Sequence, residues 1–296
     1  MKAPAMKRKR GQSLSQPSAI ITHPSSIAPH PSKHLGQHFL RDPRTIDRII
    51  RAFAPVPHET VLEIGPGTGA LTAALVASGS RVVAIEFDNK LVPFLLERFG
   101  SLDNFKLVQA DALTTDYCAE ILPARAARLV ANLPYNISTA ILQRLIEQRS
   151  CLAEMVLMLQ REVVERILAP PGSSERGFLS VLVEAYCETE KLFDVAPGSF
   201  RPPPKVWSSV IRLKPRAKLK AEVKDEELLW QVVSAGFAQK RKTILNNLRH
   251  TSGRLEEVVS KNGGASIVLC KAGVELQRRA ETLTVDEWAR IVWAME

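Results

Sequence analysis

The sequence predicts an α/β fold: an open sheet with helices on both faces, followed by a small all-helical domain. Between about residues 43 and 160, short apolar runs of strand length alternate with helical segments. This alternation is typical of a parallel sheet. Beyond about residue 215 every recognisable segment is helical. We therefore expect a boundary near residue 214, with an α/β domain at 33–214 and a helical domain at 215–296.

The elements follow one another at regular spacing. Asp42 and Pro43 fit a helix N-cap and a first helical position, so we expect a helix from this pair to Ala54. Further helices are expected at Ala70–Ser78 and Asn89–Phe99. The predicted strands are Thr60–Ile64, Arg81–Ile85, Phe105–Gln109, Ala127–Ala131 and Met155–Leu159, with Val181–Phe193 and Val206–Leu213 as a paired edge. The predicted C-terminal helices are Asp225–Phe237, Gln239–Arg249, Gly253–Val259 and Val285–Met295.

The charge of the chain is unevenly distributed. The 296 residues carry a net charge of +9. Residues 1–41 hold seven Lys and Arg and no acid, residues 42–198 have net −5, and residues 199–296 have net +7. Basic segments attract polyanions, and we favour nucleic acid over a membrane because no basic helix rich in Trp and Phe is present. No apolar run approaches the roughly 20 residues that a bilayer-spanning helix needs.

Residues 1–32 differ in composition from the rest of the chain. They are rich in Pro, Ser, Lys and Arg and hold few bulky apolar residues, so they bury too little surface to offset the entropy of the chain. We expect a disordered, solvated basic tail. Contact of Lys7–Arg10 with RNA and a transit-peptide role are the alternatives.

The four cysteines are widely spaced and form no C-x-x-C motif. We therefore expect no disulfide framework, no metal site and a reducing compartment. The expected location is the cytoplasm.

A glycine-rich turn follows the first predicted strand of the sheet. The turn Glu63-Ile-Gly-Pro-Gly-Thr-Gly69 opens the next helix, and its glycines allow a sharp turn and close approach of a ligand. Dinucleotide sites use G-x-G-x-x-G, whereas here Gly65, Gly67 and Gly69 are spaced as G-x-G-x-G. Glu63 precedes the first glycine by two residues, where a carboxylate can meet a cationic methionine end. We therefore favour S-adenosylmethionine (SAM) as the cofactor.

Two further acids lie at the ends of predicted strands. Glu86 comes 21 residues after Gly65, the usual distance for a carboxylate that accepts the two ribose hydroxyls. Asp111, in the segment Gln109–Ala112, follows the third strand and can accept the adenine amine of the cofactor. Each acid taken singly is compatible with an ordinary loop residue. Open α/β sheets bind ligands at the carboxyl ends of their strands, so we expect these side chains to meet in one site.

The segment Asn132-Leu-Pro-Tyr-Asn-Ile-Ser138 follows the apolar run 128–131, which we expect to be a buried strand. The Asn132 side chain and a backbone carbonyl at Leu133 or Pro134 can each accept one N–H of a base amine. Proline has no N–H and a fixed φ, so the carbonyl is held outward, and Tyr135 can stack on a flipped base. A plain strand-to-turn junction would also use Asn and Pro.

Three more segments carry recognisable motifs: Gly36-Gln-His-Phe-Leu40, Phe200-Arg-Pro-Pro-Pro-Lys-Val206 and Phe237-Ala-Gln-Lys-Arg-Lys-Thr-Ile-Leu-Asn-Asn-Leu248. With the glycine turn, Glu86, Asp111 and the tetrad that begins at Asn132, they resemble a known family. This family is the KsgA-type (RsmA) small-subunit rRNA adenine dimethyltransferases. The resemblance extends from about Lys33 to the end of the chain, and it is specific because two C-terminal motifs match as well.

The resemblance implies a Rossmann-like methyltransferase sheet that binds SAM and dimethylates N6 of two adjacent adenines near the 3′ end of 16S rRNA. The implied substrate is a pre-assembled small ribosomal subunit, so the protein would act in ribosome biogenesis. We expect a monomer without a metal. The implied cofactor contacts are His38, Leu40, Gly65, Glu86, Asp111 and Asn132, and Gln37, Glu63, Gly67 and Ala112 belong to the same predicted site.

One position in this site departs from the family pattern. The family usually has Asn where this chain has His38. Histidine also forms hydrogen bonds, so we expect the contact to be kept, and protonation would make binding depend on pH. The long N-terminal extension is also outside the usual pattern.

For catalysis the sequence indicates alignment without a strong general base, which agrees with the absence of a candidate His or Asp beside the tetrad in the sequence. The amine acceptors would hold N6 in line with the methyl group, and positioning supplies much of the rate. Tyr135 would stack on one face of the base, and Phe200 would cover the other face or serve as a core aromatic. One candidate RNA contact is Lys205, in the proline-rich loop. Others are Lys240, Arg241 and Lys242, which we expect to lie with Arg249 on one side of a helix. These cations would either bind phosphates or form a solvated helix face.

Four other interpretations share some of these features. A 23S rRNA adenine methyltransferase of the antibiotic-resistance type has the same cofactor motifs and tetrad, but segments 200–206 and 237–248 argue against it. A DNA adenine N6-methyltransferase would need a target-recognition domain, and none is recognisable. A structural checkpoint in ribosome assembly stays open. So does a mitochondrial transcription factor derived from this fold, which would need the tail to be a transit peptide.

Overall fold

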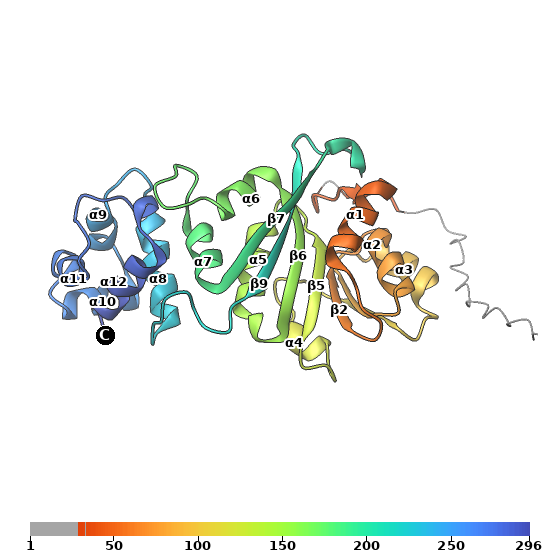
Figure 1. Ribbon diagram of the computed structural model, residues 1–296, viewed down its shortest axis with the longest axis horizontal. Coiled ribbons are helices and arrows are strands. Elements are labelled where there is room, and N and C mark those ends of the chain that lie inside the picture. Colours follow the sequence, from red (N-terminus) through yellow and green to blue (C-terminus); the bar gives the residue numbers. More distant parts are fainter. Residues whose placement is uncertain (1–28, 33) are drawn as a thin grey trace, which may run out of the picture.

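The computed structural model describes residues 29–32 and 34–296 and shows an α/β part followed by a group of helices (Figure 1). In Figure 1 the C-terminal helices lie at the left beside α7, and the first strands and helices lie at the right. The predicted tail lies outside the described residues except for 29–32, and so does the candidate RNA contact at Lys7–Arg10.

The central sheet has seven strands in the order β4-β3-β2-β5-β6-β9-β7. The first five are parallel, and β9 runs antiparallel to both of its neighbours. The predicted open α/β sheet with a paired edge is therefore confirmed. The strands are β2 Thr60–Ile64, β3 Arg81–Glu86, β4 Phe105–Gln109, β5 Ala127–Asn132, β6 Leu152–Gln160, β7 Cys187–Val195 and β9 Ser208–Pro215.

Helices cover both faces of this sheet. Successive strand residues point to opposite faces: in β2, Val61 belongs to the apolar cluster of α1 and α2, whereas Leu62 belongs to that of α4, α5 and α7. Both clusters are closed to solvent, which fixes the register of the strands because a one-residue slip would exchange the two faces. The helices of this part are α1 Pro43–Phe53, α2 Ala70–Ala77, α3 Leu91–Phe99, α4 Tyr117–Glu120, α5 Ser138–Glu147, α6 Arg161–Ile167 and α7 Phe178–Tyr186.

The start of α1 follows the predicted pattern. The Asp42 carboxylate accepts the backbone N–H groups of Arg44 and Thr45 at 3.3 and 3.2 Å. Two of the N–H groups that lack a partner inside the helix are thereby satisfied. Pro43 occupies the first turn, and Ala54, with φ of 49°, ends the helix.

A two-stranded sheet joins the N-terminal motif to the proline-rich loop. Strand β1, Phe39–Leu40, pairs antiparallel with β8, Phe200–Arg201. Leu40 lies opposite Phe200, and both belong to the apolar cluster of α1 and α2. This pairing was not predicted, because two-residue strands far apart in the sequence have no periodic signal of their own.

The strand predicted at Val181–Phe193 was wrong in its first part. Helix α7 extends to Tyr186, and β7 begins at Cys187. Nearly all of α7 is buried, so its apolar residues show no helical stripe, and a continuous apolar run does not distinguish a buried helix from a buried strand. The expected pairing of the edge was correct, since β7 pairs with β9.

The C-terminal segment is helical, as predicted, but one helix is shorter than expected. The predicted helix Gln239–Arg249 begins only at Ile244, because Thr243 is its N-cap and residues 239–243 form a turn. Strand β9 ends at Pro215 and α8 begins at Glu226, so the boundary near 214 stays a prediction. The helices are α8 Glu226–Phe237, α9 Ile244–Arg249, α10 Gly253–Lys261, α11 Ala265–Lys271, which was not predicted, and α12 Val285–Trp293.

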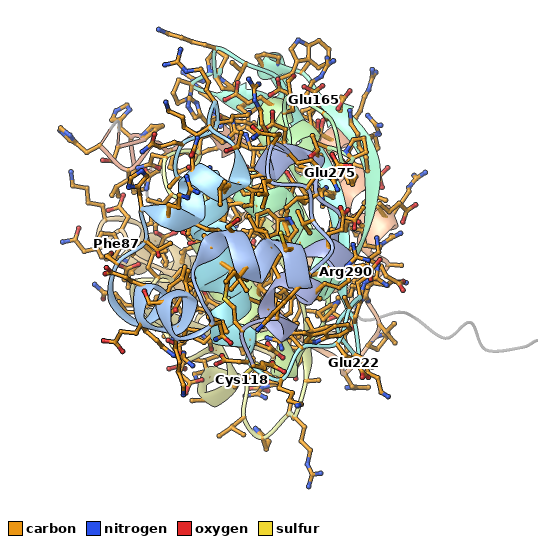
Figure 2. All side chains as sticks on the ribbon, turned by 90° about the vertical axis from the view of Figure 1, so that its left-hand side faces the viewer. Phe87, Cys118, Glu165, Glu222, Glu275 and Arg290 are labelled. Carbon is orange, nitrogen blue, oxygen red and sulfur yellow. A yellow bond between two sulfur atoms is a disulfide. The ribbon has the colours of Figure 1, made fainter. Side chains whose placement is uncertain are left out.

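The expectation about cysteines was wrong for one pair. Cys118, which is labelled in Figure 2, forms a disulfide with Cys151 between α4 and the short helix that precedes β6. They are 33 residues apart in the chain, and only the packing of these segments brings them together. Cys187 is a buried free thiol and Cys270 an exposed one.

Within residues 29–32 and 34–296, no helix is long and apolar enough to cross a membrane. In the same residues no group of three or more His, Cys, Asp or Glu side chains is arranged to hold a metal ion.

Candidate active site

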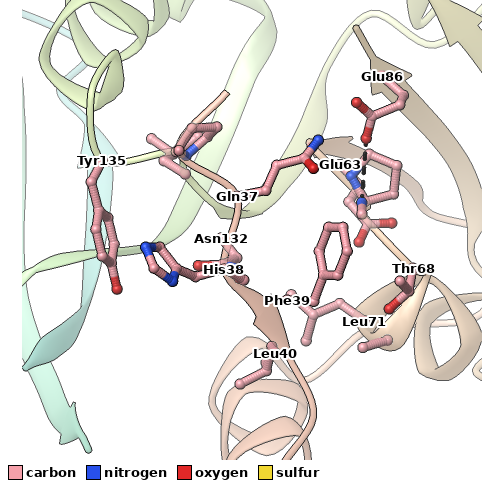
Figure 3. Close-up of a pocket in the computed structure, with 17 residues that line it drawn as sticks. Gln37, His38, Phe39, Leu40, Glu63, Thr68, Leu71, Glu86, Asn132 and Tyr135 are labelled. Atoms are coloured by element: carbon pink, nitrogen blue, oxygen red, sulfur yellow. Dashed lines mark hydrogen bonds between the residues drawn. The ribbon is translucent and has the colours of Figure 1, made fainter. Parts of the chain in front are cut away.

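Two adjoining cavities lie at the carboxyl edge of the parallel strands. We name them the tetrad cavity, which contains the residues Asn132 to Tyr135, and the Asp111 cavity. Four residues line both: Gln37, Gly65, Glu86 and Pro134. In the tetrad cavity Tyr135 lies on one side, and Glu63 and Glu86 lie on the other (Figure 3). One elongated ligand can therefore reach from the Asp111 cavity toward the tetrad.

The residues predicted from the sequence for the cofactor come together here. All ten line at least one of the two cavities, and so do all four tetrad residues. His38, Leu40, Glu63, Gly67 and Asn132 line the tetrad cavity, Asp111 and Ala112 line the Asp111 cavity, and Gln37, Gly65 and Glu86 line both.

The glycine turn and Glu86 form one hydrogen-bonded unit. Gly67 has φ of +58°, and a Cβ at this position would lie 3.1 Å from the Phe39 ring. The Gly67 N–H donates to Glu86 Oε2 at 3.3 Å, and the Asp88 N–H donates to Glu86 Oε1 at 2.8 Å. Burial raises the pKa of Glu86 despite these bonds. The carboxylate is thus held at the rim of both cavities by backbone groups.

Glu63 is the most deeply buried acid of the site. Its side chain is 2% exposed, and its Oε2 accepts the Thr72 hydroxyl at 2.7 Å. Burial raises its pKa to about 7, and the nearby charge of Glu86 acts in the same direction. A cationic ligand group in the tetrad cavity would favour the ionised form of this carboxyl.

Asp111 sits at the end of β4 with one carboxylate oxygen engaged. Its Oδ1 accepts the Leu113 N–H at 2.8 Å. Within residues 29–32 and 34–296, the other oxygen accepts no hydrogen bond. The side chain therefore presents an acceptor to a cavity whose walls include Ile64, Ile85 and Leu113.

The orientation of the Asn132 amide is set by the N-terminal motif. Its Nδ2 donates to the backbone carbonyl of His38 at 3.1 Å. Since the nitrogen faces His38, Oδ1 is left as an acceptor at the end of β5. The next two carbonyls differ: Pro134 O accepts the Ile137 N–H at 3.3 Å, whereas Leu133 O accepts no turn hydrogen bond from the described residues.

His38 and Tyr135 form a stacked pair beside this amide. Their ring centroids are 5.4 Å apart with an angle of 28° between the planes. His38 Nδ1 lies 2.8 Å from the Pro202 carbonyl, so it carries the proton of that bond. The Tyr135 hydroxyl and Ser208 Oγ share a hydrogen bond of 2.6 Å. His38, which the sequence analysis assigned to the cofactor site, therefore lies beside the tetrad as well.

The N-terminal segment is fastened over the site by Gln37. Its Nε2 donates to Asp88 Oδ2 at 2.9 Å, and its Oε1 accepts the Ser32 N–H at 2.7 Å. Asp88 in turn lies two residues after Glu86. The segment thereby forms one wall of both cavities.

The residues predicted for RNA lie apart from the cavities. Phe200 is 4% exposed and belongs to the apolar cluster of α1 and α2, so it is a core aromatic that lines neither cavity. Lys205 is exposed in the loop after β8. Lys240, Arg241 and Lys242 lie in the turn before α9 and not on a helix, which corrects the predicted helical face.

Several site residues were missed in the sequence. Phe39 packs against Gly67, and it stands inside the motif Gly36–Leu40, so its place there was a signal. Phe87 comes directly after Glu86, and Leu113 comes two residues after Asp111. Both line the Asp111 cavity. Ser208, which bonds Tyr135, had no signal, because its partner lies in a distant segment.

The comparisons with known proteins agree with this geometry. Residues 30–292 match the profile of a family described as "Ribosomal RNA adenine dimethylase". The chain belongs to this family. It is 40% identical over 259 residues to "Ribosomal RNA small subunit methyltransferase A" of Hahella chejuensis, covering 88% of this chain and 90% of that one. It is 46% identical over 217 residues to the protein of the same name from Pseudomonas savastanoi pv. phaseolicola, covering 73% and 81%.

Solved structures place this family member among related methyltransferases. A dimethyladenosine transferase from Plasmodium falciparum has a TM-score of 0.70 and 27% identity, covering 86% of this chain and 96% of that one. The 23S rRNA methyltransferase ErmE has a TM-score of 0.61 and 27% identity, covering 87% and 99%. The higher identity to the small-subunit proteins favours them over the 23S type.

Proposed function

We propose that this family member uses SAM to dimethylate N6 of two adjacent adenines near the 3′ end of 16S rRNA in the small ribosomal subunit. It would act as a monomer in ribosome biogenesis in the cytoplasm, where ribosomes are assembled and where the Cys118–Cys151 bond would be open. The observation that supports the proposal best is the Asn132 amide, whose Nδ2 bond to His38 leaves Oδ1 for a base amine.

The residues present fit SAM. Gly67 lets the backbone turn at positive φ, and a side chain there would meet Phe39. Glu86 would accept the ribose hydroxyls, Asp111 the adenine amine, and Glu63 would face the cationic methionine end. SAM supplies an electrophilic methyl group on a sulfonium, so the protein has no need to activate it further.

The tetrad would hold the target amine. Asn132 Oδ1 accepts one N–H, and the Leu133 carbonyl accepts the second, because the Pro134 carbonyl already accepts the Ile137 N–H. Two acceptors pull the amine toward tetrahedral geometry and localise its lone pair, and alignment with the methyl group supplies much of the rate. The Tyr135 ring, fixed by Ser208 and His38, offers an aromatic surface to the base. No strong base is needed, because the product ammonium is acidic.

The turn before α9 would contact RNA phosphates. Arg241 and Lys242 are exposed, and neither forms an ion pair with a described residue. Lys240 is partly committed, since its Nζ donates to the Ser174 carbonyl. Such contacts orient an enzyme on RNA without reading its sequence.

The test is methyl transfer from labelled SAM to unmethylated small subunits, naked small-subunit RNA, large-subunit RNA and duplex DNA, followed by digestion to nucleosides. Dimethyladenosine formed on small subunits alone supports the proposal. Label in large-subunit RNA would move the assignment to the 23S type. SAM binding without transfer to any acceptor would overturn the enzymatic proposal in favour of an assembly factor.

A further inference from the structure

We infer that Trp207 stacks on the nucleotide next to the target adenine, and so positions the RNA at the mouth of the tetrad cavity. The inference rests on the proposed function, because it assigns a role within the same RNA-modifying site. It starts from an exposed aromatic side chain that the fold and the mechanism leave unused.

Trp207 lies at the same edge of the sheet as the tetrad. It immediately precedes β9, whose first residue, Ser208, pairs with Gln160 at the carboxyl end of β6. The Trp207 carbonyl accepts the Arg161 N–H at 2.9 Å, where α6 begins. The backbone at this position is therefore tied to the sheet and is not a free loop.

The residue is joined to the base site through its neighbour. Ser208 is fully buried and shares its hydroxyl bond with Tyr135. Consecutive Cα atoms are about 3.8 Å apart, so the Trp207 backbone lies one residue from the contact that fixes the Tyr135 ring. A nucleotide that adjoins a base in the cavity would therefore lie close to the backbone of Trp207.

Trp207 differs from Trp230 and Trp288 in that its ring stacks on no other aromatic ring of the described part. Trp288 is fully buried, and Trp230 packs its ring against Tyr186 and Phe178. Trp207 is 50% exposed, and no aromatic ring of residues 29–32 and 34–296 stacks on it. An exposed indole of this kind serves RNA recognition well, because every base presents a π-face.

The surrounding loop supplies charge for the backbone of the RNA. Arg201 and Lys205 precede Trp207 and are exposed. Neither forms an ion pair with a described residue, so both are available to phosphates. Cations beside an exposed aromatic ring are the usual combination for binding single-stranded nucleic acid.

The proposed substrate indicates which nucleotide would stack on Trp207. Only one base at a time can meet the single Asn132 amide, so the second of two adjacent adenines stays outside the cavity while the first reacts. Trp207 would stack on that second adenine. This stacking contact would then hold the RNA strand in position for each methylation.

The experiment is a double-mutant cycle in which substitutions in the protein are tested on RNA with single nucleotides changed. Small subunits are reconstituted with 16S rRNA in which one or the other of the two adenines is replaced by an abasic site. Steady-state kcat/KM for methyl transfer is measured for the wild type, Trp207→Ala and Trp207→Phe. Trp293→Ala is the matched control, because Trp293 is also 50% exposed but lies at the end of α12.

On intact RNA, Trp207→Ala should lower kcat/KM between about 5-fold and about 150-fold, mainly through KM, and Trp207→Phe should recover most of the loss. On at least one abasic RNA the wild type and Trp207→Ala should become equal. SAM affinity of all variants and the kinetics of Trp293→Ala should match the wild type. Equal losses for Trp207→Ala on intact and both abasic RNAs would overturn the inference. A wild type without activity on intact subunits would instead overturn the proposed function.

Discussion

The carboxyl edge of the sheet and the turn before α9 both carry polar residues from recognisable motifs. The two regions differ in how far these side chains are buried and hydrogen-bonded. At the sheet edge, Glu63 and Glu86 are nearly fully buried, and both carboxylates accept hydrogen bonds. In the turn, Arg241 and Lys242 are exposed and form no ion pair with a described residue. Buried and bonded groups select one small ligand by geometry, whereas exposed cations attract a polyanion by charge alone.

If the sheet edge selects its ligand by geometry, loss of the Asn132 amide alone should strongly lower the rate of methyl transfer. Asn132→Ala removes the Oδ1 acceptor and should lower turnover by at least about 100-fold, as the loss of one preorganised polar contact to the reacting group commonly does. The SAM dissociation constant should rise only moderately. The measurement is methyl transfer to small subunits together with SAM titration. Asn246→Ala, at an exposed position of α9, is the control, and wild-type turnover in Asn132→Ala would break the assignment of the tetrad.

Burial of Glu63 should appear in the pH dependence of stability without SAM. Its pKa is about 7 in the fold and 4.5 in the absence of burial, so between these values the folded state binds the additional proton. Stability should therefore fall as pH rises from about 4.5 to about 7, by up to about 3 kcal/mol.

Glu63→Gln should remove this fall, because the amide does not titrate. Denaturant unfolding at several pH values checks it. Glu256→Gln, at an exposed site of α10, should keep the wild-type slope. A slope that Glu63→Gln leaves unchanged would show that another group causes it.

The glycine turn should be sensitive to a single methyl group. Gly67→Ala places a Cβ 3.1 Å from the Phe39 ring at φ of +58°, a conformation that only Gly adopts readily. SAM affinity should fall about 10-fold, measured by calorimetric titration. Gly253→Ala is matched in φ, +63°, but has open space around it, so it should bind SAM like the wild type. Equal losses in the two variants would show that backbone strain and not cavity shape is responsible.

Substitutions in the turn before α9 should have a small effect, and this effect should be limited to the affinity for RNA. Arg241→Gln combined with Lys242→Gln should lower the affinity for small subunits about 5-fold and reduce the slope of log affinity against log salt by about 1.5. SAM affinity should not change. Lys261→Gln combined with Lys271→Gln, two exposed lysines of α10 and α11, is the control pair. If both double variants lose the same affinity, the turn has no special place in RNA binding.

The sequence was most informative where one ligand imposes spacing. Most of the residues predicted for the cofactor lie at or just after the ends of parallel strands, as Glu86 and Asp111 do. The sheet brings these strand ends to one edge. It was least informative where contacts join distant segments. Phe200 belongs to the core, residues 239–243 form a turn, and Cys118 meets Cys151, and none of these outcomes leaves a local pattern.

The sequence by itself determined the alternation of strands and helices from α1 to β6, the glycine turn and the residue types of the tetrad. These depend on short-range patterns: periodicity, positive-φ glycines and the residue types at strand ends. Only the tertiary structure decided that His38 stacks on Tyr135, that Ser208 fixes the tyrosine and that Trp207 remains exposed beside them. Each of these results from the pairing of β1 with β8 and of β6 with β9, where many weak contacts between distant segments act together and no single segment encodes the outcome.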